Sequence, residues 1–174
     1  MRIAIISDTH FPSRGATLPP LCRERLAAAD LIVHAGDHCT LESVHALGGI
    51  GPPVRAVHGN ADDPTVRAAL PAILEFHLCG CHIVVVHDAG PARGRHDRMR
   101  RRFPSADIVI FGHSHIPIRE FDEDGRLLVN PGSPTDRRRQ PHHTMAEVVL
   151  APGRAPVAEI LVVDRDGGRA HQND

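Results

Sequence analysis

The chain has 174 residues, about the length of one domain, and its charge is nearly balanced, with 20 basic and 21 acidic residues. Its hydrophobic content of 41% is typical of a globular chain, and no apolar run reaches the roughly 20 residues that span a bilayer. We therefore expect no membrane partner and a cytoplasmic location. The near-neutral charge and the small number of aromatic residues available for base stacking do not indicate nucleic acid as a partner.

Short apolar runs rich in β-branched residues predict strands, and the stretches between them predict helices and turns. Strands are expected over residues 3–6, 31–33, 54–57, 72–78, 81–86, 108–111, 117–121, 127–129, 145–150 and 157–163. Four helices are expected. The first covers residues 19–29, the second ends at residue 47, the third begins at residue 64 and the fourth covers residues 95–103. Thr40 and Asp63 are the expected N-caps of the second and third helices, and Gly80 and Asp124-Gly125 mark the hairpin turns.

The β-α-β order of the first part and the hairpins of the later part predict one α/β domain over residues 1–164. Residues 165–174 are polar and are expected to fray. Cys79 and Cys81 flank the turn at Gly80, and we interpret the four cysteines as small apolar residues, with a thiolate pair as the alternative.

Histidine is unusually frequent, with 14 copies, and the placement of these residues is more informative than their number. Five predicted strands run directly into polar side chains that can bind metal. In an open α/β sheet, the carboxyl ends of the strands meet on one edge, where binding sites form. The side chains at these ends are Asp8, His10, Asp37, Asn60, His87, His113 and His115.

Imidazole, carboxylate and amide groups suit divalent transition metals, and the lack of a thiolate among them argues against a structural zinc site. Asp8 and His10 are spaced to reach one ion, His113 and His115 can divide between two ions, and Asp37 can bridge both. Two such ions leave the pocket positively charged, which suits a phosphate ester and its in-line displacement. A metal-handling protein is the alternative that the histidine number suggests, and the clustering with Asn disfavours simple storage.

The order of the motifs D-x-H, G-D, G-N-x-D, H and G-H-x-H resembles the calcineurin-like metallophosphoesterases over residues 1–150. The segments 59–62, 112–115 and 130–133 are similar to the small, single-domain bacterial and archaeal phosphodiesterase branch. One motif alone is a weak signal, but all of them in this order are specific. The resemblance implies a four-layer α-β-β-α sandwich.

The resemblance also implies a dinuclear phosphodiesterase, in which a metal-bridged hydroxide attacks the phosphorus of a small phosphate ester in line with the leaving group. One ion would be held by Asp8, His10, Asp37 and His115, and the other by Asp37, Asn60, His87 and His113. Asp37, Asn60 and His113 are the expected catalytic residues. The ions are expected to be Mn, Fe, Ni or Zn, and small relatives often self-associate, so a homo-oligomer is expected. A non-catalytic protein-interaction scaffold on the same fold is the alternative.

Two positions depart from the family pattern. Many larger members have a histidine after the Gly-Asn pair, where it protonates the leaving group, and this chain has Ala61. The loss of a general acid, worth about 10²–10⁴ in rate, predicts a preference for good leaving groups unless His38 or His58 substitutes. The segment 87–90 reads His-Asp-Ala-Gly where the branch often has H-G-H, so the second histidine is missing there.

Further candidates lie beside the expected ligands. His34, His38 and His58 are candidates for orienting the ligands or contacting substrate. Arg137, in a loop after the 130–133 turn, is the candidate for binding the substrate phosphate. The other arginine run is expected to form a solvated helix face, with phosphate recruitment as the alternative. That run is Arg98, Arg100, Arg101 and Arg102.

Overall fold

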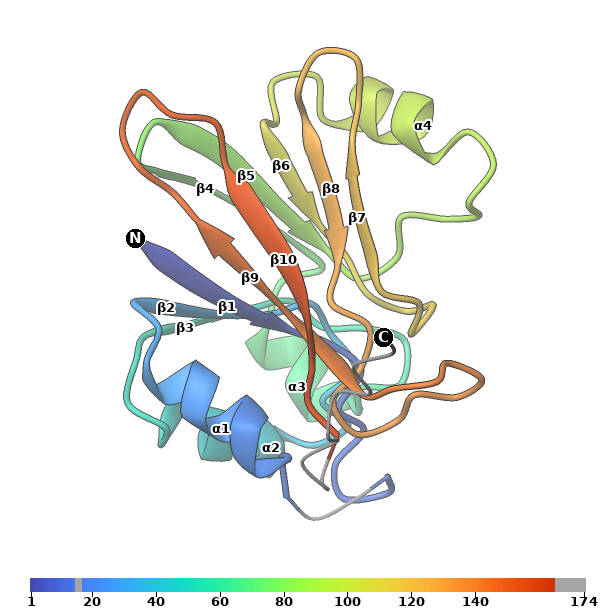
Figure 1. The fold of residues 1–174 in the computed structure, drawn as a ribbon. Coiled ribbons are helices and arrows are strands. Elements are labelled where there is room, and N and C mark those ends of the chain that lie inside the picture. Colours follow the sequence, from blue (N-terminus) through green and yellow to red (C-terminus); the bar gives the residue numbers. More distant parts are fainter. Residues whose placement is uncertain (15–16, 165–174) are drawn as a thin grey trace, which may run out of the picture.

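The computed structural model describes residues 1–14 and 17–164, and its described strands form two five-stranded sheets (Figure 1). The first sheet has the order β10-β9-β1-β2-β3 and the second has the order β4-β5-β6-β8-β7. The strands are β1 (Arg2–Ile6), β2 (Leu31–His34), β3 (Val54–Ala56), β4 (Ile73–Leu78), β5 (Cys81–Val86), β6 (Ile108–Ile110), β7 (Ile118–Phe121), β8 (Leu127–Asn130), β9 (Thr144–Val149) and β10 (Val157–Val162). Every strand predicted from the sequence is present within one residue of its expected bounds.

Alternating side chains along the strands divide the core into three layers of contacts. In β1, Ile3 and Ile5 pack with residues of the second sheet such as Ile83, whereas Ile6 packs with Leu26 on the helix side. On the far side of the second sheet, Phe111 belongs to a cluster with residues of the fourth helix. The period of two along a strand thus places one apolar face against the other sheet and the opposite face against helices. The predicted α-β-β-α sandwich is confirmed.

The described helices lie on the outer faces of the two sheets, with α4 on the second sheet and the others on the first (Figure 1). They are α1 (Pro20–Ala27), α2 (Leu41–Gly48), α3 (Pro64–Ala69) and α4 (Arg95–Arg102). Both predicted N-caps are confirmed, since Thr40 accepts from the Ser43 amide and Asp63 accepts from the Val66 amide. The first helix ends two residues earlier than expected, at Ala27.

The parallel strands of both sheets send their carboxyl ends to one edge of the sandwich. In the first sheet β1, β2 and β3 are parallel, and in the second sheet β5, β6 and β8 are parallel. Backbone bonds join the loops at this edge, from Asp8 N to Gly36 O at 2.9 Å and from Gly112 N to His87 O at 2.9 Å. Loops that are far apart in the sequence therefore meet where the predicted ligands lie.

Among the described residues, no helix is long and apolar enough to cross a membrane. The prediction made for the tail, 165–174, lies outside the described residues.

Candidate metal centre

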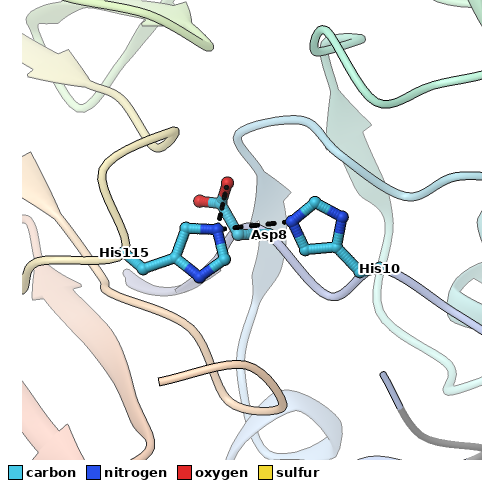
Figure 2. Close-up of side chains that lie close together, drawn as sticks. All are labelled: Asp8, His10 and His115. Atoms are coloured by element: carbon cyan, nitrogen blue, oxygen red, sulfur yellow. Dashed lines mark hydrogen bonds and ion pairs between the residues drawn. The ribbon is translucent and has the colours of Figure 1, made fainter. Parts of the chain in front are cut away.

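The first group of predicted ligands joins the loop after β1 to the loop after β6 (Figure 2). His115 Nε2 lies 3.3 Å from Asp8 Oδ1 and 3.3 Å from His10 Nε2. Asp8 and His115 are buried, and His10 is half-buried. One ligand atom from each of the three residues lies within 4.8 Å of the others, a spacing that one metal ion can bridge.

The second group is connected to the first through Asp37. Its Oδ2 atom lies 3.7 Å from His10 Nε2 and 3.4 Å from His87 Nε2. Asn60 Oδ1 then lies 3.1 Å from His87 Nε2 and 2.8 Å from His113 Nδ1. All seven side chains named from the sequence are thus linked by side-chain contacts, from five different loops.

Asp8 lies closer to the second group than a division into two separate ligand sets implies. Its carboxylate, together with Asp37 and His87, makes a group whose ligand atoms lie within 4.8 Å of one another. The Asp8 carboxylate also accepts from the His113 amide at 3.0 Å. The two carboxylates therefore lie between the two sets of histidines.

The hydrogen bonds of two histidine Nδ1 atoms show which ring nitrogen is protonated and therefore which one carries the lone pair available to a metal. His87 Nδ1 lies 2.7 Å from Ala35 O, and His115 Nδ1 contacts Asp136 O. A carbonyl oxygen only accepts, so Nδ1 carries the proton in both rings. In the neutral ring the Nε2 lone pair then faces oxygen acceptors, Asp37 Oδ2 for His87 and Asp8 Oδ1 for His115. Acceptors that face one another need a proton or a cation between them, and histidine ligands commonly donate their other N–H to a carbonyl.

The charges in the group shift the pKa values in the direction that this arrangement requires. Burial works against ionisation of Asp37. The pKa of Asp37 is nevertheless lowered to about 2, because its carboxylate accepts hydrogen bonds from His87 and the Ala61 amide and lies near the charges of His87 and His10. Burial by itself would lower the pKa of His87. The hydrogen bond to Asp37 and the charges of Asp8 and Asp37 outweigh burial, so the pKa of His87 is raised. Without a cation, a proton on His87 therefore balances the carboxylates.

Backbone strain concentrates at the same residues. Asp8, His10 and Asp37 have φ values of 56°, 48° and 62°, and His113 and His115 have φ values of 67° and 58°. Left-handed backbone is uncommon outside glycine and costs on the order of 1–3 kcal/mol per residue. Five of the eight described non-glycine residues in this conformation are predicted ligands, so the loops hold these side chains against a local conformational preference.

Glycines beside the ligands are needed mainly for space. Of Gly36, Gly59 and Gly112, which precede ligands in the sequence, only Gly36 has a positive φ, of 98°. A Cβ atom on Gly112 would overlap Ser7 Oγ and lie 2.7 Å from Asp8 Oδ2, and one on Gly59 would overlap Asp37 Oδ1. For these two glycines, close approach of the loops is the physical reason, rather than the turn conformation.

Two groups that hold the loops together were not assigned a role from the sequence. Asp62 is buried and accepts from the amides of Asp37 at 3.1 Å and of Cys39 and Gly59 at 2.6 Å each. Ser133 Oγ donates to Asp8 O at 2.8 Å. The signal for Asp62 was its place in the G-N-x-D motif, and the structure gives it the role of fixing the loops that carry Asp37 and Asn60.

The turn at residues 130–133 lies against the ligand loops. Asn130 Nδ2 donates to Gly112 O at 2.7 Å, and Asn130 Oδ1 accepts from Gly132 N at 2.8 Å. The side chain therefore supports the backbone that precedes His113 while it closes its own turn.

The neighbouring histidines lie behind the centre rather than in it. His34 and His38 are buried, with ring centroids 3.6 Å apart, in the wall of a cavity of about 330 Å³ beneath α2. Gly36 N donates to His34 Nδ1, so His34 Nε2 donates to Thr9 Oγ1 at 3.0 Å. His34 thus contacts the Gly36 amide, one residue before Asp37, and the Thr9 hydroxyl, between Asp8 and His10. His58 is half-buried, and its side-chain hydrogen bond within the described part of the chain is to Gly59 O at 3.4 Å.

The arginines of the two runs lie in different surroundings. Arg137 is exposed and donates to Gln140 O, whereas the next residue, Arg138, lies in the wall of a second cavity beside His113. The expected solvated face of α4 holds for Arg101 but is wrong for Arg98. The Arg98 guanidinium donates to the carbonyls of residues 89 and 91, because the loop before α4 folds back over it.

Both departures from the family motifs lie at this centre. The Ala61 amide donates to Asp37 Oδ1 at 2.7 Å, and its exposed methyl group offers no proton donor. Ala89 is buried in the wall of the second cavity. That cavity, of about 440 Å³, also includes His113 and Ser114 in its wall.

The chain was compared with known proteins at the level of sequence and of structure. A family model described as the calcineurin-like phosphoesterase superfamily domain matches residues 1–151. A probable metallophosphoesterase from Methanothermobacter thermautotrophicus is 35% identical over 144 residues, which cover 78% of each chain.

Solved structures agree with this match. Vacuolar protein sorting 29 from Cryptosporidium parvum aligns with a TM-score of 0.75 at 22% identity, over 92% of this chain and 97% of that one. A protein described as a novel archaeal phosphodiesterase aligns with a TM-score of 0.72 at 19% identity, over 93% of this chain and 99% of that one. With its ordered motifs and its two-sheet sandwich, the chain belongs to the calcineurin-like phosphoesterase superfamily.

Proposed function

We propose that the chain is a phosphodiesterase whose seven clustered ligands hold two divalent metal ions. The observation that carries the proposal is the position of Asp37 Oδ2, 3.7 Å from His10 Nε2 and 3.4 Å from His87 Nε2. An oxygen between two histidines that belong to different ligand sets is suited to bridging two ions. Asp8, His10, Asp37 and His115 would hold one ion, and Asp37, Asn60, His87 and His113 the other.

Two bound ions would supply Lewis-acid stabilisation of the charge that develops on the transferred phosphoryl group. The residues of the chain orient these ions and the substrate. Ala35 O and Asp136 O hold the rings of His87 and His115, and the Ala61 amide holds the remaining oxygen of Asp37. His113 lies at the open side of the group, in the wall of the second cavity, where the substrate would enter.

A diester is preferred over a monoester in this proposal because there is room for a second ester group. The cavity beside His113 has a volume of about 440 Å³, within the range typical of small-molecule sites. The likeness in fold to an archaeal phosphodiesterase supports the same choice.

The experiment is elemental analysis of the purified chain, paired with turnover of matched phosphodiesters and phosphomonoesters. We expect about two transition-metal ions per chain and faster hydrolysis of the diesters. Asn60→Ala should lose metal and turnover while it remains folded, whereas Asp97→Asn, an exposed carboxylate on α4, should retain both. Faster hydrolysis of monoesters would contradict the choice of substrate.

A scaffold without catalytic activity is the second candidate, favoured by the likeness in fold to vacuolar protein sorting 29. The two candidates differ in one measurement. Stoichiometric metal without turnover of any phosphate ester would favour the scaffold, and loss of turnover in Asn60→Ala would favour the enzyme.

A further inference from the structure

A second cavity opens directly beside the candidate metal centre. It has a volume of about 440 Å³ and lies between the loop that follows β5 and the segment that follows β6. Its wall includes the ligand candidate His113 and two arginines from different parts of the chain, Arg95 and Arg138. A group bound there would lie next to any phosphate held at the metal centre.

Arg95 is a buried cation without a counter-ion among the described residues. It is 6% exposed, its Nε atom has no hydrogen-bond partner, and its Nη2 atom makes one long bond of 3.4 Å to Gly90 O. The guanidinium lies over the Phe111 ring, 5.0 Å from the centroid. A buried charge that lacks an anionic partner is costly, and the contact with the Phe111 ring is the compensating interaction that the fold supplies.

The position of Arg95 in its helix does not stabilise the buried charge either. It is the first residue of α4, at the end of the helix where a positive charge is unfavourable, whereas Arg100, Arg101 and Arg102 lie in the last turn. Burial lowers the pKa of Arg95 and the Arg98 charge acts in the same direction, whereas the charges of Glu120 and Asp88 oppose them, and the net shift is downward. A bound anion would relieve both effects.

Two carboxylates act on Arg95, and each has another partner. Asp88 lines the same cavity, and its Oδ1 accepts from Gly90 N at 2.6 Å. Glu120 Oε2 pairs with His96 Nε2 at 2.9 Å. Neither carboxylate forms an ion pair with Arg95.

Further donors line the cavity. Ser114 Oγ accepts from Asn130 Nδ2 at 3.2 Å and from Ile116 N at 3.3 Å, and its own hydroxyl proton has no acceptor among the described residues. Arg138 lies in the wall in a left-handed backbone conformation, with φ of 48°. Two guanidinium groups and one hydroxyl donor suit an oxyanion, and Arg forms especially strong bonds with carboxylates and phosphates.

We propose that this cavity binds a second anionic group of the substrate, a carboxylate or a phosphate on the ester arm that is not the leaving group. The inference rests on the proposed phosphodiesterase function and adds the charge class of the substrate. Arg95 and Arg138 bind that group, while the metal centre holds the diester phosphate. Arg95 is then a specificity-determining residue.

The test compares 4-nitrophenyl phosphodiesters that share one leaving group. Their other arm is 3-carboxypropyl, 3-phosphonooxypropyl or the neutral 3-carbamoylpropyl. Charge-assisted hydrogen bonds of the usual strength predict a kcat/KM roughly 10- to 100-fold higher for an anionic arm than for the neutral one. The better of the two anionic arms identifies the group that the cavity prefers.

Variants separate the role of Arg95 from a general effect of charge. Arg95→Gln should lower kcat/KM for the anionic arms far more than for the neutral arm, and so remove the preference for an anionic arm. Arg138→Gln, at an exposed position, should reduce the preference without a risk to the core. The matched control is Arg101→Gln, which removes the same charge from an exposed position on α4 and should retain the preference.

A binding experiment decides the inference independently of turnover. In EDTA, NMR titration of the wild-type chain with glutarate should shift the amides of residues 89, 112 and 114, and titration with glutaramide should not. Arg95→Gln, judged folded by its own spectrum, should bind glutarate at least tenfold more weakly than Arg101→Gln does. Equal binding in these two variants, or equal shifts from glutaramide, would overturn the inference. Failure of every diester to turn over would instead contradict the proposed function.

Discussion

His87 Nε2 lies 3.4 Å from Asp37 Oδ2, at the point where the two ligand sets meet. Against the desolvation that burial imposes, Asp37 and Asp8 raise the pKa of His87, so in the metal-free chain this ring holds a proton that a metal ion must displace. We therefore predict that metal binding releases protons near neutral pH. The sign follows from the direction of the shift, because below the raised pKa each metal-binding event must remove this proton.

The measurement is calorimetric titration of the metal-free chain with Mn²⁺ in buffers of different ionisation enthalpy. Affinity should fall as pH falls from 8 to 6, by up to about tenfold per pH unit for each proton released. His87→Gln should bind more weakly and release fewer protons, whereas His142→Gln, at an exposed position, should match the wild type. Affinity that is independent of pH in the wild type would contradict the prediction.

Asp62 is a second residue on which the centre depends, although it is not a predicted ligand. Its carboxylate accepts from three amides in two ligand loops, so Asp62→Ala leaves three N–H groups without their acceptor. We expect a loss of about 2–4 kcal/mol in the free energy of unfolding, together with weaker metal binding. The neighbouring Asp63→Ala removes a helix N-cap and should cost only about 1 kcal/mol. Urea denaturation in EDTA compares the two, and similar losses would count against the role given to Asp62.

The positions of the ligands could be predicted from the sequence because each follows an apolar strand. Runs such as Ile3–Ile6 identify buried strands, and the parallel order of those strands brings their ends to one edge. The hairpin at Gly80 could be predicted for a similar local reason, because a glycine between two apolar runs marks a tight turn. In the structure Cys79 and Gly80 have positive φ values there, 52° and 86°.

The supporting contacts could not be predicted from the same local patterns. Asp62 binds amides that lie up to 25 residues away, and Arg98 binds carbonyls of a loop that charge patterning does not describe. The burial of Arg95 did have a signal in the sequence. It lies four residues before Met99, on the same helix face, and both side chains are buried. Charge patterning treats the arginines of α4 alike, whereas the helical spacing of Arg95 from Met99 separates it from the exposed Arg101.

The buried imidazole of His34 predicts how the stability of the metal-free chain depends on pH. Burial lowers the pKa of His34 well below 6.5, and the His38 charge acts in the same direction. Because the unfolded chain takes up this proton near pH 6.5 and the folded chain does not, stability falls as pH decreases through that value.

The lowered pKa values of His38 and His10 add to this loss, and the raised pKa of His87 opposes it. Urea midpoints in EDTA at pH 7 and pH 5 test the net effect, and we expect the lower midpoint at pH 5. His34→Gln keeps a donor near Thr9 Oγ1 and should reduce the difference by up to about 1.4 kcal/mol per pH unit. An unchanged difference in His34→Gln would assign the pH dependence to other groups.

Gly112 tests the requirement for close approach between loops. A Cβ atom there would overlap Ser7 Oγ and press on Asp8, so Gly112→Ala must displace either the His113–His115 loop or the β1 loop. We expect loss of metal from the purified variant and destabilisation of about 1–3 kcal/mol. Gly48→Ala is the matched control, since nothing lies within 4 Å of the added methyl group at the end of α2, and it should leave the metal content unchanged. Equal metal content in both variants would contradict the steric role.

Ala61 predicts how the reaction depends on the leaving group. Its side chain carries no acid, His38 Nε2 is engaged with Val57 O at 3.2 Å behind the centre, and the His58 ring bonds to its own loop. Alkyl leaving groups need protonation as the ester bond breaks, whereas 4-nitrophenolate leaves without it. We therefore expect a wild-type kcat roughly 10²–10⁴-fold lower for an alkyl diester than for an aryl diester of the same arm.

Ala61→His adds an imidazole at an exposed position and should raise the alkyl rate more than the aryl rate. Its pH–rate profile should show a new dependence on a group of pKa near 6.5. Ala61→Gln is the control for size. Equal wild-type rates on both esters would mean that another group already supplies the proton.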